Sequence, residues 1–395
     1  MTLQQEPATK FPFPFDGTNL SAEFAVLREQ EPVARIELPN GTRAWLLTRY
    51  ADVRGMLNDH RFSRAAAEKP DAPKLGPFSP STQSLLGMDP PDHTRLRRLV
   101  SRAFTPQRME RLRPPITEHA AKLLTGLLQG PRPVNLLAGF ALPLATTAIF
   151  ELLGIPDADS GPLHTWTPVL FNARATNDAD PFDQLKLYLH DIIESVRRAG
   201  VTEGVIGSLI SAHDDEEQLT EEELVHFVLL LITAGHRSTA NAIVSVLMNL
   251  LRRPALFERL RREPELIPAA VEELLRYNTY ASLGVLPRVA VADVELGGVT
   301  IQAGDMVLGS LGAADHDGSF FPDPETIDFD RDSSGHLMFG HGVHFCIGAL
   351  MGRMEVQVAV EQVLRVLPPT LRLAGPAEQV PLQELVVGLV LGELP

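Results

Sequence analysis

Residues 339–348 read FGHGVHFCIG, and they include Cys346, the single cysteine of this 395-residue chain. One cysteine cannot form an intrachain disulfide, and it cannot supply a multi-cysteine zinc or iron–sulfur site. An isolated cysteine is most often a small buried hydrophobic residue. Here it follows a histidine in a glycine-rich loop and precedes an apolar run, so the rest of the sequence must decide its role.

The composition is that of a soluble globular protein, because 44% of the residues are hydrophobic and 22% are charged. The formal net charge of −15 argues against general nucleic-acid binding, which needs a basic surface. The N-terminal stretch MTLQQEPATKFPFPFDG lacks the basic and apolar regions of a secretion signal. The longest apolar stretch, residues 140–155, is too short to cross a bilayer and contains Pro143. We therefore expect a cytoplasmic protein without a membrane segment.

Hydrophobic periodicity and turn residues predict a mainly α protein with small β-sheets at its edge. Asn40-Gly41 marks a hairpin turn between two β-prone runs. No repeat and no linker-like segment divides the chain. We expect one domain over 1–395, with a helical core at about 49–276 and 346–367 and β-rich edges at about 33–47, 286–310 and 380–395.

The longest predicted helix, residues 220–252, is apolar on all sides in its middle, as expected of a helix through the centre of a large domain. Thr220 and Glu223 form a capping box at its start. The polar stretch AGHRST begins at Ala234 inside the buried run, and a glycine there costs up to about 1 kcal/mol relative to alanine. Either Gly235 lets a neighbouring helix approach, or Ala234 and Gly235 open space for a ligand.

Two further helices carry polar residues with a distinctive spacing. In HTRLRRLVSRAF (93–104), His93 and Arg97 are neighbours at the edge of an apolar arc, where two cation donors favour an anion. The opposite face is either solvated or a docking patch for an acidic partner, and it holds Arg95, Arg98 and Arg102. In PAAVEELLRY (268–277), Glu272 and Glu273 are four and three residues before Arg276, which alone is a weak motif.

Together these stretches resemble a bacterial cytochrome P-450, in the right order over nearly the whole chain. FGHGVHFCIG fits that family's cysteine-loop pattern of Phe, Gly, Gly, a basic residue, Cys and Gly. The resemblance implies the cytochrome P-450 fold, with haem b between the long central helix and the cysteine loop. It also implies that Cys346 is the axial thiolate ligand of the haem iron, which favours O–O cleavage.

The resemblance assigns roles to further residues of this sequence. Haem contacts are implied for Phe339, Gly340, Gly348, Ala234 and Gly235, and propionate contacts for His93, Arg97, Arg288, His336 and His344. A structural network is implied for Glu273, Arg276 and Arg331. The rival interpretation is a zinc cluster, but its spacing matches no usual zinc pattern and leaves AGHRST unexplained; its ligands would be His336, His341, His344 and Cys346.

The sequence departs from the family pattern in the central helix, where an acid and a threonine usually help to deliver protons. Arg237 stands at the position of the acid and Ser238 at that of the threonine, followed by Thr239. Arginine is effectively never deprotonated, whereas serine keeps a hydroxyl that donates and accepts. Three interpretations stay open: Arg237 pairs with a carboxylate while water and Ser238 carry protons, Arg237 holds substrate or water, or the enzyme catalyses oxidative coupling.

Family position also predicts a mostly apolar substrate pocket. Its candidate residues are Leu86, Met88, Phe171, Val228, Ile232, Thr233, Ala234, Ser282, Leu283, Val285, Val387 and Leu389. The chain has no appended reductase, so electrons are expected from NAD(P)H through a reductase and a ferredoxin that docks at Arg95, Arg98 and Arg102.

We thus expect a monomeric monooxygenase that oxidises a bacterial secondary metabolite. The alternative reaction is C–C or C–N coupling of an aromatic or peptide-like substrate such as a cyclodipeptide. A non-catalytic haem protein is the alternative from another functional class.

Overall fold

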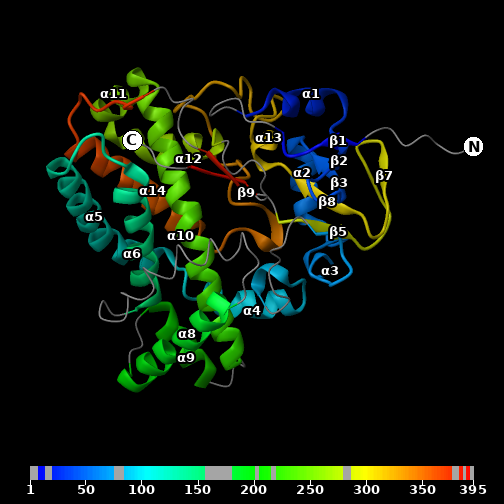
Figure 1. Ribbon diagram of the computed structural model, residues 1–395, viewed down its shortest axis with the longest axis horizontal. Coiled ribbons are helices and arrows are strands. Elements are labelled where there is room, and N and C mark those ends of the chain that lie inside the picture. Colours follow the sequence, from blue (N-terminus) through cyan, green and yellow to red (C-terminus); the bar gives the residue numbers. More distant parts are fainter. Residues whose placement is uncertain are drawn as a thin grey trace, which may run out of the picture.

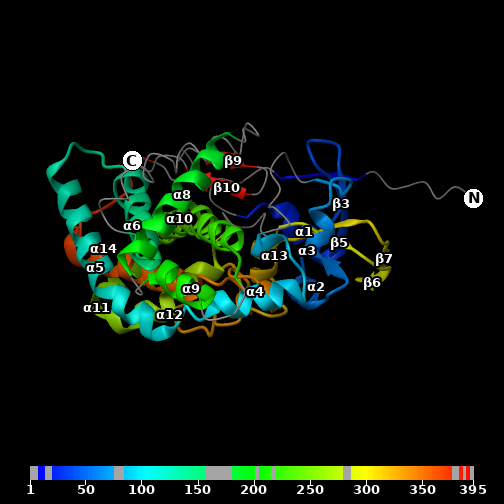
Figure 2. The same cartoon turned by 90° about the horizontal axis from the view of Figure 1, so that it is seen from below.

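The computed structural model describes residues 8–13, 20–74, 84–155, 180–200, 204–214, 219–278, 286–375, 382–385 and 388–391. Helices fill one part of the molecule, and most strands gather in another part beside helices α1 and α2 (Figures 1 and 2). Helix α10 (Glu221–Leu251) runs through the helical part with α6, α8 and α14 on its sides. This is the mainly α architecture that the sequence predicts; that the whole chain forms one domain stays a prediction.

The described helices follow the expected order along the chain. Before α10 they are α1 (Ala22–Gln30), α2 (Tyr50–Asn58), α3 (Arg64–Ala67), α4 (Asp92–Ser101), α5 (Pro106–Gln129), α6 (Leu142–Leu153), α8 (Asp180–Ala199) and α9 (Gly204–Asp214). After it they are α11 (Pro254–Arg262), α12 (Ile267–Arg276), α13 (Leu311–Asp315) and α14 (Ala349–Val366).

The described strands form one six-stranded sheet and two hairpins. Most lie at the predicted edges, but the short strands at 9–10 and 62–63 were not predicted, and the second falls within the range predicted as helical. The sheet has the order β1-β2-β3-β8-β5-β4 and contains β1 (Thr9–Lys10), β2 (Val33–Glu37), β3 (Arg43–Leu47), β4 (Phe62–Ser63), β5 (Arg288–Ala290) and β8 (Met306–Gly309). The predicted hairpin is present, with Val33 opposite Leu47 and with Gly41 at a φ of 79° in its turn. The two small hairpins are β6 (Val294–Leu296) with β7 (Val299–Ile301), and β9 (Leu382–Leu385) with β10 (Gly388–Leu391).

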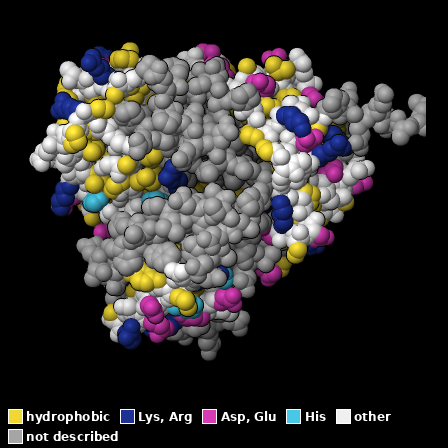
Figure 3. Space-filling model, viewed as in Figure 1, with side chains coloured by type: hydrophobic (Ala, Val, Ile, Leu, Met, Phe, Trp, Pro, Cys, Tyr) yellow, Lys and Arg dark blue, Asp and Glu magenta, His cyan; other side chains and the backbone are white. Residues whose placement is uncertain are grey.

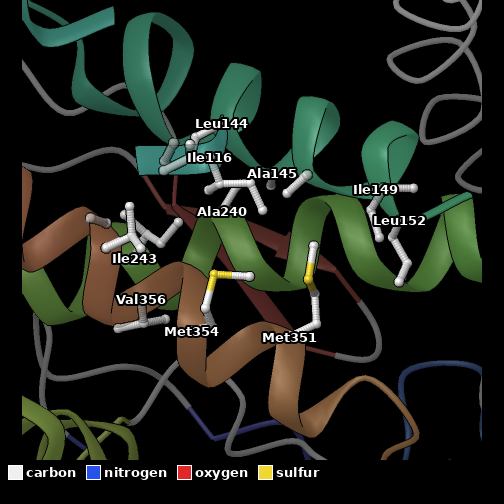
Figure 4. Close-up of a cluster of buried hydrophobic side chains, with 14 of the residues drawn as sticks. Ile116, Leu144, Ala145, Ile149, Leu152, Ala240, Ile243, Met351, Met354 and Val356 are labelled. Atoms are coloured by element: carbon white, nitrogen blue, oxygen red, sulfur yellow. The ribbon is translucent and has the colours of Figure 1, made fainter. Parts of the chain in front are cut away.

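The largest hydrophobic core lies between α6, α10 and α14. Figure 4 shows Ile149 of α6, Ala240 of α10 and Met351 of α14 among its side chains. The predicted capping box is present, because Thr220 Oγ1 accepts from the Glu223 N–H at 3.1 Å and Glu223 Oε2 accepts from the Thr220 N–H at 2.9 Å. Since α14 packs along α10, the loop before α14 is held near the middle of α10.

Among the described residues, one helix, α10, is long and apolar enough to cross a bilayer. However, 56% of its most apolar window is buried inside the protein, which is typical of a core helix. On the face in Figure 3, the described acidic and basic side chains lie interspersed rather than segregated by sign.

Candidate active site at the cysteine loop

The cysteine loop, residues 339–348, turns tightly and leads into α14. The backbone N–H of Cys346 donates to the carbonyl oxygen of Phe339 at 2.8 Å, which closes the loop. Gly340 and Gly342 adopt φ angles of 73° and 70°, a region that other residues rarely enter. A Cβ on Gly342 would also lie 2.6 Å from the carbonyl oxygen of Leu57 in α2. Glycine at position 342 therefore lets the loop dock on α2.

Cys346 is exposed at this loop, three residues before α14 begins at Ala349. Burial of its surroundings raises the pKa of the thiol, while the backbone N–H of Gly348 and the charges of Arg97 and Arg353 oppose that rise. The N-terminus of a helix adds partial positive charge nearby. The loop thus presents one thiol near two arginines and a helix N-terminus, although burial keeps the pKa of that thiol above its ordinary value.

Four side chains that were predicted as propionate partners converge beside the loop. We call them the cation cluster; it consists of His93, Arg97, Arg288 and His344. The imidazole rings of His93 and His344 are 4.3 Å apart between centroids, which brings α4 against the cysteine loop. Both ring nitrogens of His93, Nε2 of His344 and Nε of Arg288 are buried without a hydrogen-bond partner.

The electrostatics of the cation cluster show that it lacks negative charge. Burial, followed by the charges of His93 and Arg288, lowers the pKa of His344 to about 3. Burial and then the charge of Arg64 lower the pKa of Arg288 to about 10. Asp89 is a nearby carboxylate, but it accepts hydrogen bonds from the Ser63 hydroxyl and, at 2.9 Å, from the Arg64 N–H.

The buried nitrogens without partners show whether a haem fits this structure. Buried donors without partners cost free energy, so they indicate a group that is bound in the working protein. A haem would bring two propionate carboxylates to these nitrogens, and Cys346 would hold its iron. The residues present therefore fit a haem. No group of three or more His, Cys, Asp or Glu in the described part of the chain could hold a metal ion.

His336, which was also predicted to contact a propionate, lies elsewhere. Its Nε2 is 3.2 Å from Oε2 of Glu272, and its Nδ1 accepts from the backbone N–H of Met338 at 3.1 Å. Both ring nitrogens are thus engaged with the protein, and the structure places His336 outside the cation cluster. The stretch HLMFG (336–340) alone did not reveal this, because the partner Glu272 is 64 residues away.

The predicted network of Glu273, Arg276 and Arg331 is present. Arg276 donates from Nε and Nη2 to the two carboxylate oxygens of Glu273, both at 2.8 Å, and both side chains are fully buried. Arg331 Nε lies 3.3 Å from Oε1 of Glu273. Arg276 also donates to the carbonyl oxygens of Asp315 and Thr326, which ties α12 to the segment that leads into the cysteine loop.

In the middle of α10, Ala234 and Ser238 are exposed, while the flanking Thr233 and His236 are buried. The Ser238 hydroxyl donates to the Ala234 carbonyl oxygen at 2.6 Å. Arg237 and Thr239 are partly exposed, and burial lowers the pKa of Arg237. The small side chains at 234 and 238 therefore leave one side of α10 open.

Gly235 lies against α6, and the haem contact that the resemblance implies for it stays a prediction. A Cβ at this position would lie 2.5 Å from Cδ1 of Ile149 in α6. The missing side chain therefore allows α6 and α10 to pack closely, which is the first of the two interpretations of this glycine. Space on the open side comes from Ala234 and Ser238 instead.

The substrate-contact predictions divide by burial. Leu86, Met88 and Ala234 retain exposed surface. Val228, Ile232 and Thr233 are buried, and the Thr233 hydroxyl donates to the Leu229 carbonyl oxygen at 2.9 Å; that these three contact substrate stays a prediction. The remaining candidates lie outside the described residues or, for Leu389, outside the described side chains; they are Phe171, Ser282, Leu283, Val285, Val387 and Leu389.

Leu230 and Arg64 were missed by the sequence analysis. Leu230 is partly exposed one helical turn before Ala234, a signal that i, i+4 spacing could have given. Arg64 is 2% exposed and donates to the carbonyl oxygens of Leu86, at 2.9 Å, and Pro287. Its charge also acts on His344 and Arg288 of the cation cluster. No local sequence motif marks Arg64.

Of the predicted docking arginines, Arg98 and Arg102 are exposed on α4. Arg95 instead forms an ion pair with Glu223 at the start of α10. The sequence placed all three on one face because a helical wheel does not show which neighbouring helix covers its edge.

Comparisons with known proteins agree with this geometry. The family model described as Cytochrome P450 matches residues 162–372. Mycinamicin IV hydroxylase/epoxidase of Micromonospora griseorubida is 42% identical over 373 residues, covering 93% of each chain. Nocardicin C N-oxygenase of Nocardia uniformis subsp. tsuyamanensis is 40% identical over 367 residues, covering 92% of each chain.

Solved structures show the same similarity over almost the full length. The structure of the mixed-function P450 MycG has a TM-score of 0.90 at 40% identity, covering 98% of this chain and 99% of that one. The structure of cytochrome P450mel 107F1 with biaryl coupling reactivity has a TM-score of 0.88 at 34% identity, with the same coverage.

Proposed function

The chain belongs to the cytochrome P450 family and is a haem-thiolate monooxygenase, and from this premise we propose that it oxidises a bacterial secondary metabolite in a tailoring step. The observation that carries the proposal is the exposed Cys346 thiol beside a cation cluster with unpartnered buried donors. The names of the relatives support the substrate class, because one acts on mycinamicin IV and another on nocardicin C.

We infer that Cys346 binds the iron of haem b and that the cation cluster binds its propionates. When bound, the haem supplies oxygen activation, and the thiolate ligand favours O–O cleavage. The cation cluster would then gain the anions that its orphaned nitrogens lack. Gly340 and Gly342 keep the loop in the conformation that presents the thiol, and Ala234 keeps the facing side of α10 open.

Proton delivery falls to the hydroxyl of Ser238 in this proposal. That hydroxyl donates its hydrogen to the Ala234 carbonyl oxygen, so its lone pairs are left to accept a hydrogen bond from water on the open side of α10. Arg237 stays protonated at neutral pH even though burial lowers its pKa, so it cannot serve as the relay. It fixes a positive charge next to Ser238, where the family has an acid.

Oxidative coupling of an aromatic or peptide-like substrate, such as a cyclodipeptide, is the second candidate reaction. It is favoured by Arg237 and Ser238, because coupling removes hydrogen from the substrate and inserts no oxygen. One solved relative is described as having biaryl coupling reactivity, and one curated relative is biflaviolin synthase CYP158A1 of Streptomyces coelicolor. A non-catalytic haem-binding role is the remaining alternative.

For electron supply we propose a ferredoxin and its reductase drawing on NAD(P)H. Helix α4 lies beside the cysteine loop, and it exposes Arg98 and Arg102 toward solvent. Val343 and Leu350 are exposed hydrophobic residues on and after that loop. An acidic ferredoxin would meet positive charge and apolar surface here, so its electron-transfer rate should fall as salt increases. We place the enzyme in the cytoplasm as a monomer.

The first experiment records the visible spectrum of the purified protein after reduction with dithionite and addition of carbon monoxide. The long-wavelength Soret band of thiolate-ligated haem is expected, and Cys346→Ala should abolish it. A band of histidine-ligated or neutral haem in the wild type would refute the monooxygenase mechanism. Well-folded protein without haem would refute the whole proposal.

The second experiment measures product mass with a surrogate ferredoxin system and a panel of candidate metabolites. A gain of one oxygen indicates hydroxylation, and a loss of two hydrogens indicates coupling. The double variant Arg237→Glu, Ser238→Thr should change the fraction of the consumed electrons that is recovered in product. If rate, coupling efficiency and product all stayed the same, the departure from the family pattern would have no mechanistic role. Haem without turnover on any substrate would favour the non-catalytic alternative.

A further inference from the structure

Glu272, the neighbour of the buried Glu273, makes a second connection between α12 and the cysteine region. Its Oε1 accepts from Nε of Arg353 in α14 at 2.7 Å, and its Oε2 lies 3.2 Å from Nε2 of His336. Burial raises the pKa of Glu272, but the hydrogen bonds from His336 and Arg353 outweigh it and leave the pKa below its ordinary value. Glu272 is therefore an ionised carboxylate with both oxygens engaged.

The hydrogen bonds of His336 also fix its tautomer. Nδ1 accepts from the backbone N–H of Met338, so the ring proton sits on Nε2 and is donated to Glu272. Consequently Arg353 is the cationic partner of Glu272, and His336 is a neutral donor. His336 donates from the segment just before the loop, and Arg353 donates from α14, which follows the loop.

Arg353 lies on the aromatic ring that begins the cysteine loop. Its guanidinium carbon is 4.3 Å from the centroid of the Phe339 ring. The same ring packs on the first turn of α14, where a Cβ on Gly352 would lie 3.5 Å from it. Phe339 in turn accepts the Cys346 N–H through its carbonyl oxygen. Arg353 is thus held from one side by Glu272 and from the other by the loop.

The charge of Arg353 thus lies beside the loop that holds the sulfur. Its guanidinium covers the ring of Phe339, whose carbonyl oxygen accepts the Cys346 N–H at 2.8 Å. Arg97 belongs to the cation cluster, where the haem propionates would neutralise it. Arg353 stands apart from that cluster and is paired with Glu272 instead.

We propose that Arg353, held by Glu272 against the Phe339 ring, is a positioning residue that sets the charge environment of the Cys346 thiolate and raises the reduction potential of the iron bound there. The inference rests on the haem-thiolate site of the proposed function. Reduction adds one electron to the iron–thiolate unit, so a nearby positive charge favours the reduced form and a nearby negative charge disfavours it. Arg353 and Glu272 must then act in opposite directions.

The test is a spectroelectrochemical titration of the haem-loaded protein, with dithionite as the reductant and redox mediators. Arg353→Met should shift the reduction potential to a more negative value, and Glu272→Gln should shift it to a more positive value. The double variant should lie between the two. A purely structural role would not give shifts of opposite sign, since either change would only loosen the loop.

Arg365→Met is the matched control, because Arg365 lies exposed in the last turn of the same helix. Its potential should match that of the wild type. Shifts of the same sign in the two single variants, no shift, or an equal shift in the control would overturn the inference. Glu272→Gln keeps the size of the side chain and one oxygen acceptor. If Arg353→Met does not take up haem, the direction of the potential shift in Glu272→Gln is therefore the deciding measurement.

The carbon monoxide spectrum separates this inference from the proposed function. A wild type without the thiolate-type band would refute the proposed function, and this inference with it. Thiolate-type bands in the wild type and both variants, together with unchanged potentials, would refute only the role of Arg353.

Discussion

Individual residues around the cysteine loop are held in charge states that the surrounding protein imposes. Asp315 is fully buried at the end of α13, where its Oδ1 accepts the Leu337 N–H at 2.7 Å and its Oδ2 has no partner. Burial raises the pKa of Asp315 well above its ordinary value, against smaller opposing effects of the Leu337 N–H and Arg276. A neutral carboxylic acid thus anchors the segment before the loop.

Asp315→Asn should make the protein relatively more stable as the pH rises. The pKa of Asp315 is higher in the folded than in the unfolded protein, so its favourable contribution is complete below the unfolded value, near 3.8. That contribution is lost as the pH rises toward the folded pKa, because the unfolded carboxyl releases its proton first. Asparagine has no such proton, and its amide oxygen still accepts from Leu337.

Urea unfolding of both proteins at several pH values above about 4 measures this effect. The difference in the free energy of unfolding between Asn and Asp at position 315 should grow with pH. Asp71→Asn, at an exposed position, is the control and should show no growing difference. A constant difference at position 315 would show that Asp315 is ionised when folded.

At the scale of elements, short segments that are far apart in the sequence are joined by single buried side chains. Arg64 in the four-residue helix α3 pairs with Glu68, and both side chains are 2% exposed. It also donates to Leu86 and Pro287, which precede α4 and β5. These elements carry His93, Arg97 and Arg288 of the cation cluster. One arginine therefore fixes the spacing of the segments that hold the cluster.

Arg64→Met should lower the free energy of unfolding by about 3–5 kcal/mol, because it removes the cation of a buried ion pair. Combining it with Glu68→Leu should recover part of the loss, since the buried carboxylate of that pair is then removed as well. The control is Arg61→Met, which removes an exposed partner of Asp59 and should cost less than about 1 kcal/mol. Denaturant unfolding measures all three; equal losses at positions 61 and 64 would contradict the account.

At the scale of the whole molecule, the candidate site collects charge from four places along the chain. The cation cluster draws on α4, β5 and the cysteine loop, and α3 adds Arg64 beside it. The helical core holds α14 along α10 beneath the loop, and the six-stranded sheet holds β4 and β5. The cluster therefore forms only when the chain is folded. The repulsion between its arginine side chains depends on whether an anion is bound between these segments.

Removing the haem should lower the melting temperature and make it more dependent on salt. Without the propionates, the charged members of the cluster, Arg97 and Arg288, repel each other and Arg64, and salt weakens that repulsion. Raising the salt from about 0.1 M to about 1 M shortens the Debye length from about 10 Å to about 3 Å. The melting temperature of the apoprotein should therefore rise more than that of the holoprotein.

Arg288→Met provides the control for this salt effect, since it removes one cation of the cluster. In the apo form this variant should show a smaller salt-dependent rise than the wild type. Thermal unfolding followed by circular dichroism measures each form. Equal salt effects in apoprotein and holoprotein would show that the cluster does not carry the repulsion.

Local signals in the sequence determined the elements and the chemistry of the site. The Asn40-Gly41 hairpin, the capping box at Thr220 and the FGHGVHFCIG loop each follow from neighbouring residues, and all are present in the structure. The network of Glu273, Arg276 and Arg331 was implied by the family resemblance, because the spacing of Glu273 and Arg276 alone is a weak motif. The family resemblance then supplied the cation cluster, residue by residue.

Tertiary structure decided which neighbour each of the remaining residues meets. Gly235 packs against Ile149, and Arg95 forms an ion pair with Glu223. His336 and Arg353 are the partners of Glu272, whereas the sequence analysis noted the spacing of Glu272 and Arg276. The tertiary structure also brought Arg64 to the edge of the cation cluster. Helical periodicity shows which residues share a face but not which element covers that face, because that depends on packing between segments that are far apart in the sequence.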